Sequence, residues 1–152
     1  MIVRLPRDLR VTEESVSVPE KDPELVLKPV EDGVFLYSVA GKLVGQSLFD
    51  QTGATVSVGD AKSYRIDKDE GGKIRFAPFV EDEKSFRYET YGNVGTNNYS
   101  LYEYRPGSVL PVLAARVTPE PLDHDYYYAD LSESANVFRT LLFVATVSHL
   151  SL

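Results

Sequence analysis

The turn that begins at Asp67 contains the residues whose spacing comes nearest to a metal-binding motif. Asp67, Asp69 and Gly72 occupy the first, third and sixth places of an EF-hand-type loop, which binds calcium through oxygen atoms arranged around a sharp glycine turn. The fifth place is Gly71 and the twelfth is Pro78, so two of the expected oxygen ligands are absent. We therefore interpret the turn as a solvated hairpin tip, with Asp67 and Asp69 as its candidate calcium ligands, and we expect no cofactor.

A second cluster, Asp123-His124-Asp125, combines carboxylates with an imidazole. This combination suits a divalent metal or an acid–base pair, and a hydrolase would depend on it. Three adjacent residues cannot all point at one ion from regular structure, although a loop could bring two of them together. The Gly-x-Ser-x-Gly nucleophile motif and the Walker A loop are both absent from the sequence. We interpret the cluster as a polar surface loop and predict that the protein is not an enzyme.

Tyrosine is the most distinctive residue type, with 10 Tyr and 7 Phe against no Trp. Side chains alternate along a strand, so Tyr102 and Tyr104 would share one face, as would Phe86 and Tyr88. Tyrosine combines a large contact area with a polar hydroxyl, which suits protein interfaces and the stacking of sugar rings. Ordinary cross-strand pairing inside a sheet is the alternative interpretation. The candidate interface or ligand-binding residues are Tyr88, Tyr91, Tyr99, Tyr102, Tyr104, Tyr126 and Tyr127.

The segments that carry these residues are short, rich in β-branched and aromatic residues, and separated by glycine, proline and asparagine. Gly33–Val39 and Leu43–Phe49 are predicted to form a hairpin across Ala40-Gly41-Lys42. We expect an all-β, mostly antiparallel fold, a sandwich or barrel of about eight to ten short strands with at most one short helix. That helix is predicted to follow the three tyrosines at 126–128, near Asp130–Glu133.

The two ends of the chain differ in character. Residues 1–30 are punctuated by prolines and predict an extended N-terminal arm with one or two edge strands, one of them at Glu14–Val18; residues 31–152 predict a single β-rich domain. The run Val137–Val147 is apolar except for Arg139, Thr140 and Thr146, and its β-branched residues favour a strand over a helix. Such a strand would be buried on both faces, either inside a sheet or beneath a neighbouring subunit.

Composition excludes several classes of function. The 152 residues carry a net charge of −7, from 23 acidic and 16 basic residues, and the basic residues are scattered. This distribution argues against binding to nucleic acid or to an anionic membrane surface. The absence of cysteine excludes disulfides and thiolate chemistry. We see no signal peptide or transmembrane segment, because the longest apolar stretch is far shorter than the roughly 20 residues a spanning helix needs; cytoplasmic synthesis is expected, and the final location is left open.

Taken together, these features favour a non-catalytic structural protein that assembles with copies of itself or with a larger complex. A virion accessory component, such as a capsid-decorating or tail protein, is one concrete form of this hypothesis. The alternative is a β-sandwich module that binds carbohydrate on a tyrosine platform. A hydrolase with a carboxylate–histidine site is the third hypothesis.

Overall fold

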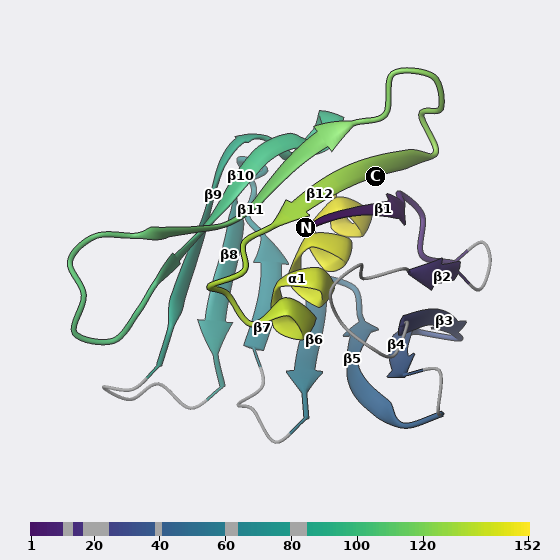
Figure 1. The fold of residues 1–152 in the computed structure, drawn as a ribbon, viewed down its shortest axis with the longest axis horizontal. Helices are drawn as coiled ribbons and strands as arrows, with labels where there is room; N and C mark the ends of the chain where they lie inside the picture. Colours follow the sequence, from purple (N-terminus) through teal and green to yellow (C-terminus); the bar gives the residue numbers. More distant parts are fainter. Residues whose placement is uncertain (11–13, 17–24, 39–40, 60–63, 80–84) are drawn as a thin grey trace.

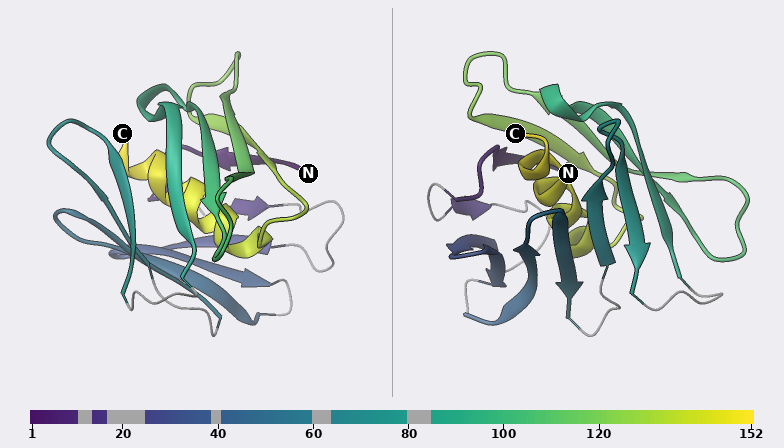
Figure 2. Two further views of the ribbon diagram at one scale, coloured as in Figure 1. Left: turned by 90° about the vertical axis from the view of Figure 1, so that its left-hand side faces the viewer. Right: turned by 180° about the vertical axis from the view of Figure 1, so that it is seen from behind.

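Two antiparallel sheets lie around one long α-helix in the computed structural model of the chain (Figure 1). The structure describes residues 1–10, 14–16, 25–38, 41–59, 64–79 and 85–152. The helix α1 (Val137–Leu150) occupies the centre of the molecule, and strands surround it in all three views (Figures 1 and 2). The predicted fold class, a mostly antiparallel all-β sandwich or barrel with at most one short helix, is confirmed: the described residues form a sandwich-like arrangement of two sheets with a single α-helix.

The larger sheet is a seven-stranded meander in which each strand pairs with its successor. It contains β2 (Glu14–Val16), β3 (Leu25–Val30), β4 (Gly33–Ser38), β5 (Leu43–Phe49), β6 (Gly53–Val58), β7 (Tyr64–Lys68) and β8 (Ile74–Pro78). The predicted hairpin is present as β4 and β5, and Gly41 between them has a φ of 83°, a conformation that favours glycine. Val39 and Ala40 of the predicted hairpin lie outside the described residues.

The smaller sheet has five strands in the order β1-β12-β11-β10-β9. Its strands are β1 (Ile2–Pro6), β9 (Arg87–Asn93), β10 (Asn98–Tyr104), β11 (Val112–Pro119) and β12 (Tyr126–Leu131). A short 3₁₀ helix, η1 (Val94–Thr96), joins β9 to β10. Strand β8 of the larger sheet lies against β9, and β2 lies against β1, so the two sheets approach each other on both sides of α1.

The prediction of a strand at Val137–Val147 is wrong, because this run forms most of α1. Asn136 caps the helix by accepting a hydrogen bond from the Arg139 backbone N–H at 3.0 Å. Residues 140–148 are all buried, so the helix packs against strands on every side and needs apolar residues all round. Placing a β-branched residue in a helix instead of alanine costs less than about 0.7 kcal/mol. The free energy gained by burying these side chains between two sheets outweighs that cost.

The helix predicted near Asp130–Glu133 is also misplaced, since Tyr126–Leu131 forms strand β12 and the helix begins six residues later. At the other end of the chain, residues 1–30 supply β1, β2 and β3, and β1 and β2 lie at sheet edges. Residues 17 and 18 of the strand predicted at Glu14–Val18 lie outside the described residues. No helix in the described part of the chain has both the length and the apolar character needed to cross a membrane.

Candidate binding face

Three of the seven candidate tyrosines point into the core. Tyr88, Tyr99 and Tyr127 are 5%, 1% and 0% exposed. The hydroxyls of Tyr99 and Tyr127 donate hydrogen bonds to the Val144 carbonyl of α1, at 3.3 and 3.5 Å. Burial raises the pKa of both phenols, which keeps them neutral hydrogen-bond donors. The structure therefore corrects the prediction for these three residues: they anchor the central helix and cannot contact a partner or ligand at the surface.

Tyr88 belongs to a polar network at one end of the core. Its hydroxyl donates to Glu103 Oε2 at 3.1 Å and accepts from Arg139 Nη1 at 3.1 Å. Glu103 is 2% exposed and also accepts from Arg105 Nε at 2.9 Å. Burial raises the pKa of Tyr88, and the hydrogen bond from Arg139 opposes this shift by lowering it. Because each buried charge has a partner of opposite sign or a hydroxyl within reach, we interpret the network as a structural link between β9, β10 and α1.

On the same strands, the tyrosines whose side chains point to the other face of the five-stranded sheet face outward. Tyr91, Tyr102 and Tyr104, together with Leu113 of β11, form what we call the tyrosine cluster. Leu113 pairs with Tyr102 across the β10–β11 ladder, and the rings of Tyr91 and Tyr102 meet edge to face with centroids 5.4 Å apart. Tyr91 is 53% exposed and Leu113 is 42% exposed. The cluster is thus a patch of aromatic and aliphatic surface open to solvent.

Glu89 holds the cluster in place. Its Oε2 atom accepts hydrogen bonds from the hydroxyls of Tyr91, at 2.6 Å, and Tyr104, at 3.3 Å. The bond to Glu89 raises the pKa of Tyr91, because the carboxylate stabilises the protonated phenol. The Arg87 guanidinium lies 5.4 Å from the centre of the Tyr104 ring. Glu89 therefore links the Tyr91 and Tyr104 hydroxyls through one carboxylate oxygen.

The same outer face continues across β11, β12 and β1. There Arg4 stacks on Tyr126, with its guanidinium carbon 3.6 Å from the ring centroid. A depression of about 400 Å³ lies beside them on this half of the sheet. It is lined by Ile2, Arg116, Thr118, Tyr128 and Asp130. Sequence reasoning missed this site, because the site joins the consecutive strands β11 and β12 to β1, which lies at the other end of the chain.

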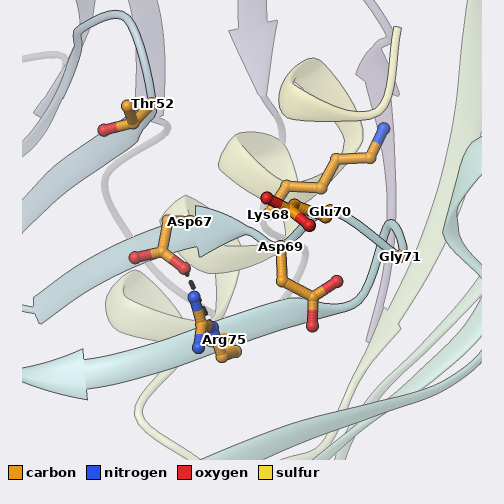
Figure 3. Close-up of a pocket in the computed structure, with 7 residues that line it drawn as sticks. All are labelled: Thr52, Asp67, Lys68, Asp69, Glu70, Gly71 and Arg75. Atoms are coloured by element: carbon orange, nitrogen blue, oxygen red, sulfur yellow. Dashed lines mark hydrogen bonds and ion pairs between the residues drawn. The ribbon is translucent and has the colours of Figure 1, made fainter.

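The Asp67 turn forms the tip of the β7–β8 hairpin and borders a surface hollow of about 580 Å³ (Figure 3). Asp67 is directed at Arg75, with its Oδ1 atom 3.3 Å from Arg75 Nε. Asp69 Oδ1 accepts a hydrogen bond from the Lys73 backbone N–H at 2.9 Å, which closes the turn. The two candidate calcium ligands therefore have separate structural partners, as expected of a hairpin tip.

The Asp123-His124-Asp125 cluster lies on the surface loop between β11 and β12. His124 and Asp125 are exposed, and Asp123 Oδ2 lies 3.6 Å from Arg4 Nη2. Asp123 Oδ1 accepts a hydrogen bond from the Asp125 backbone N–H at 3.0 Å, as in a polar turn. Within the described ranges, no group of three or more histidine or acidic residues is placed to hold a metal ion.

Comparisons with known proteins identify no relative of this chain. No protein-family model, no curated protein and no solved structure matches the chain. The functional argument therefore depends on the outer face of the five-stranded sheet, which carries both the exposed tyrosines and the depression.

Proposed function

We propose that the protein is a non-catalytic assembly protein that associates with copies of itself through the tyrosine cluster. The observation that carries the proposal is the edge-to-face pair of Tyr91 and Tyr102 beside Leu113, exposed on a sheet face. Tyrosine is enriched at the centres of protein interfaces, where its ring is buried and its hydroxyl keeps a polar partner. In the cluster the rings are exposed and open to burial by a partner, and the hydroxyls of Tyr91 and Tyr104 already have a polar partner in Glu89.

Preorganisation of the cluster favours binding. Fixing a mobile side chain on association costs roughly 0.5–1.5 kcal/mol. Here the hydroxyls of Tyr91 and Tyr104 are already held by Glu89, and the Tyr102 ring lies against Tyr91. Much of that cost is therefore met within the folded chain, and a partner surface can cover the rings without ordering them.

The charge distribution favours a second copy as the partner. The chain carries −7, so two copies repel each other over most of their surfaces. The outer face of the five-stranded sheet has both signs, with Arg4, Arg87 and Arg116 among Glu89 and Asp130. Repulsion between two copies is smallest where such a mixed face meets its equivalent, and opposite charges can pair across it.

The proposal includes roles in which many copies cover or extend a larger structure. A capsid-decorating or tail component of a virion is one such role, and it would require a self-complementary face of this kind. The argument for assembly itself depends only on the tyrosine cluster and the charges around it.

The test is the native mass in solution, measured by light scattering on a sizing column over a range of concentrations. We expect a defined multiple of the 17.0 kDa chain for the wild type. Leu113→Arg places a charge in the cluster and should shift the mass to that of one chain. The matched control is Leu48→Arg, which alters an outward residue of β5 with similar exposure, 38%, and should leave the oligomer intact.

Two results would overturn the proposal. One is a wild-type protein that remains a single chain at every concentration up to its solubility limit. The other is an oligomer that Leu113→Arg and Leu48→Arg affect equally, since the contact would then lie elsewhere. Circular dichroism of both variants shows whether a loss of mass reflects dissociation of folded chains.

A further inference from the structure

The depression on β1, β12 and β11 has a lining set by the strand register. Ile2 pairs with Asp130 across the β1–β12 ladder, and Asp130 pairs with Arg116 across the β11–β12 ladder. Thr118 pairs with Tyr128 in the next outward row. Each of the five has at least one strand neighbour that is buried in the core, so all five side chains project from the outer face. These buried neighbours are Val3, Ala115, Val117, Tyr127, Ala129 and Leu131.

The size of the depression matches a small ligand. Its volume is about 400 Å³, within the range of roughly 300–1,000 Å³ typical of small-molecule sites. The Ile2 side chain and the Tyr128 ring supply apolar surface, while Arg116, Thr118 and Asp130 supply polar groups. The site therefore suits a ligand that has both an apolar face and several polar substituents.

The charges of the lining select for a neutral ligand. Arg116 and Asp130 are cross-strand neighbours of opposite sign. An anion that approaches Arg116 would meet the carboxylate, and a cation that approaches Asp130 would meet the guanidinium. A hydroxyl both donates and accepts a hydrogen bond, so adjacent hydroxyls can satisfy the carboxylate and the guanidinium together.

The polar groups are already positioned. Arg116 donates from Nη1 to the Val117 carbonyl at 2.8 Å and from Nη2 to Asn98 Oδ1 at 2.5 Å. A guanidinium has five N–H donors, so donors remain for a ligand. Asp130 is 59% exposed and uses Oδ1 to accept from the Met1 amine at 3.1 Å. Little rearrangement is needed before binding.

We propose that this depression is a binding site for a neutral saccharide. The Tyr128 ring packs on the apolar C–H face of a sugar ring, Asp130 accepts hydrogen bonds from its hydroxyls, and Arg116 and Thr118 donate to its oxygen atoms. The lining does not include Leu113, Tyr91 or Tyr102, so the site is distinct from the tyrosine cluster, although Arg116 and Asp130 belong to the same mixed-charge face.

The test is a titration of the isotopically labelled protein, followed by NMR, with glucose, galactose, mannose and N-acetylglucosamine. Inorganic phosphate and glycine serve as an anionic and a zwitterionic probe. At least one sugar should saturate with a dissociation constant in the millimolar range and shift the amide signals of Thr118, Tyr128 and Asp130. Asp130→Asn should weaken that binding about tenfold or more, because a charge-assisted hydrogen bond contributes roughly 1.5–3 kcal/mol.

Glu133→Gln is the matched control, since it makes the same change of charge at an exposed residue close to Asp130 in the chain and outside the lining of the depression. It should leave the affinity for the sugar unchanged. Failure of all four sugars to shift these signals overturns the proposal, as does saturable binding of phosphate or glycine in their place. A sugar that shifts signals elsewhere, or that binds Asp130→Asn as tightly as the wild type, would show that the depression is not the site.

Discussion

Replacing Phe143 tests whether α1 is the centre of the core. Phe143 is fully buried, and its ring meets Tyr88 at 4.8 Å, Tyr64 at 5.2 Å and Phe76 at 5.4 Å between centroids. Truncation of a buried phenylalanine to alanine costs about 3–5 kcal/mol, including the cavity it leaves. Three aromatic contacts, each worth about 0.5–1.5 kcal/mol beyond buried area, place Phe143→Ala at the upper end of that range.

Urea unfolding followed by circular dichroism measures this loss. A cost of about 5 kcal/mol lowers the unfolding midpoint by about 2.5 M if the denaturant slope is near 2 kcal/mol/M. Because domains of this size have only about 5–15 kcal/mol of stability, Phe143→Leu provides a milder variant, with an expected cost of about 1–1.5 kcal/mol.

Phe79→Ala is the matched control, since Phe79 is 59% exposed and the substitution should change stability by less than about 0.5 kcal/mol. If Phe143→Ala cost no more than Phe79→Ala, α1 could not lie between the two sheets.

Two further predictions concern the packing and the titration of the core. Gly45→Ala would place a Cβ 2.6 Å from Leu142 Cδ1 and 2.8 Å from the Ser57 carbonyl oxygen, so urea unfolding should show a loss of about 1–3 kcal/mol; Gly71→Ala, at the exposed hairpin tip, should be close to neutral. Burial lowers the pKa of His149 below its ordinary 6.5, so the unfolded chain takes up a proton first and the free energy of unfolding should fall as the pH drops below about 6.5. His149→Asn keeps a hydrogen-bond acceptor near the Nδ1 position but does not titrate. If the free energy of unfolding of this variant fell with pH as steeply as that of the wild type, His149 would not be the group responsible.

The strands could be predicted from the sequence, but the direction of their side chains could not. In β10, Tyr99, Leu101 and Glu103 point inward, while Tyr102 and Tyr104 point outward. Both sets contain tyrosine, and the inward set contains a carboxylate, so hydropathy does not identify the buried face. The partners that make Glu103 acceptable in the core come from β9 and from the residue that follows β10, and their positions depend on the fold.

The central helix and the depression show two other limits of sequence reasoning. An apolar run buried on all sides has no polar stripe, so periodicity cannot separate a helix from a strand, and β-branched residues then favour the wrong choice. The depression depends on Ile2, Arg116 and Asp130, which the register of three strands brings together. Arg116 and Asp130 belong to consecutive strands, but Ile2 is far from both in the chain, and no local pattern in the sequence links it to them.

The position of α1 in the chain determines the order in which the protein can fold during synthesis. A ribosome produces all twelve strands of the described residues before the helix on which their apolar faces pack. β1 also cannot pair until β12 has been synthesised, since Ile2 pairs with Asp130. Until both segments emerge, the strands have no completed core, and apolar surface of this kind makes nascent chains prone to aggregate. The chain therefore depends on late, long-range closure, and its yield in cells should respond strongly to chaperones that hold unfolded strands apart.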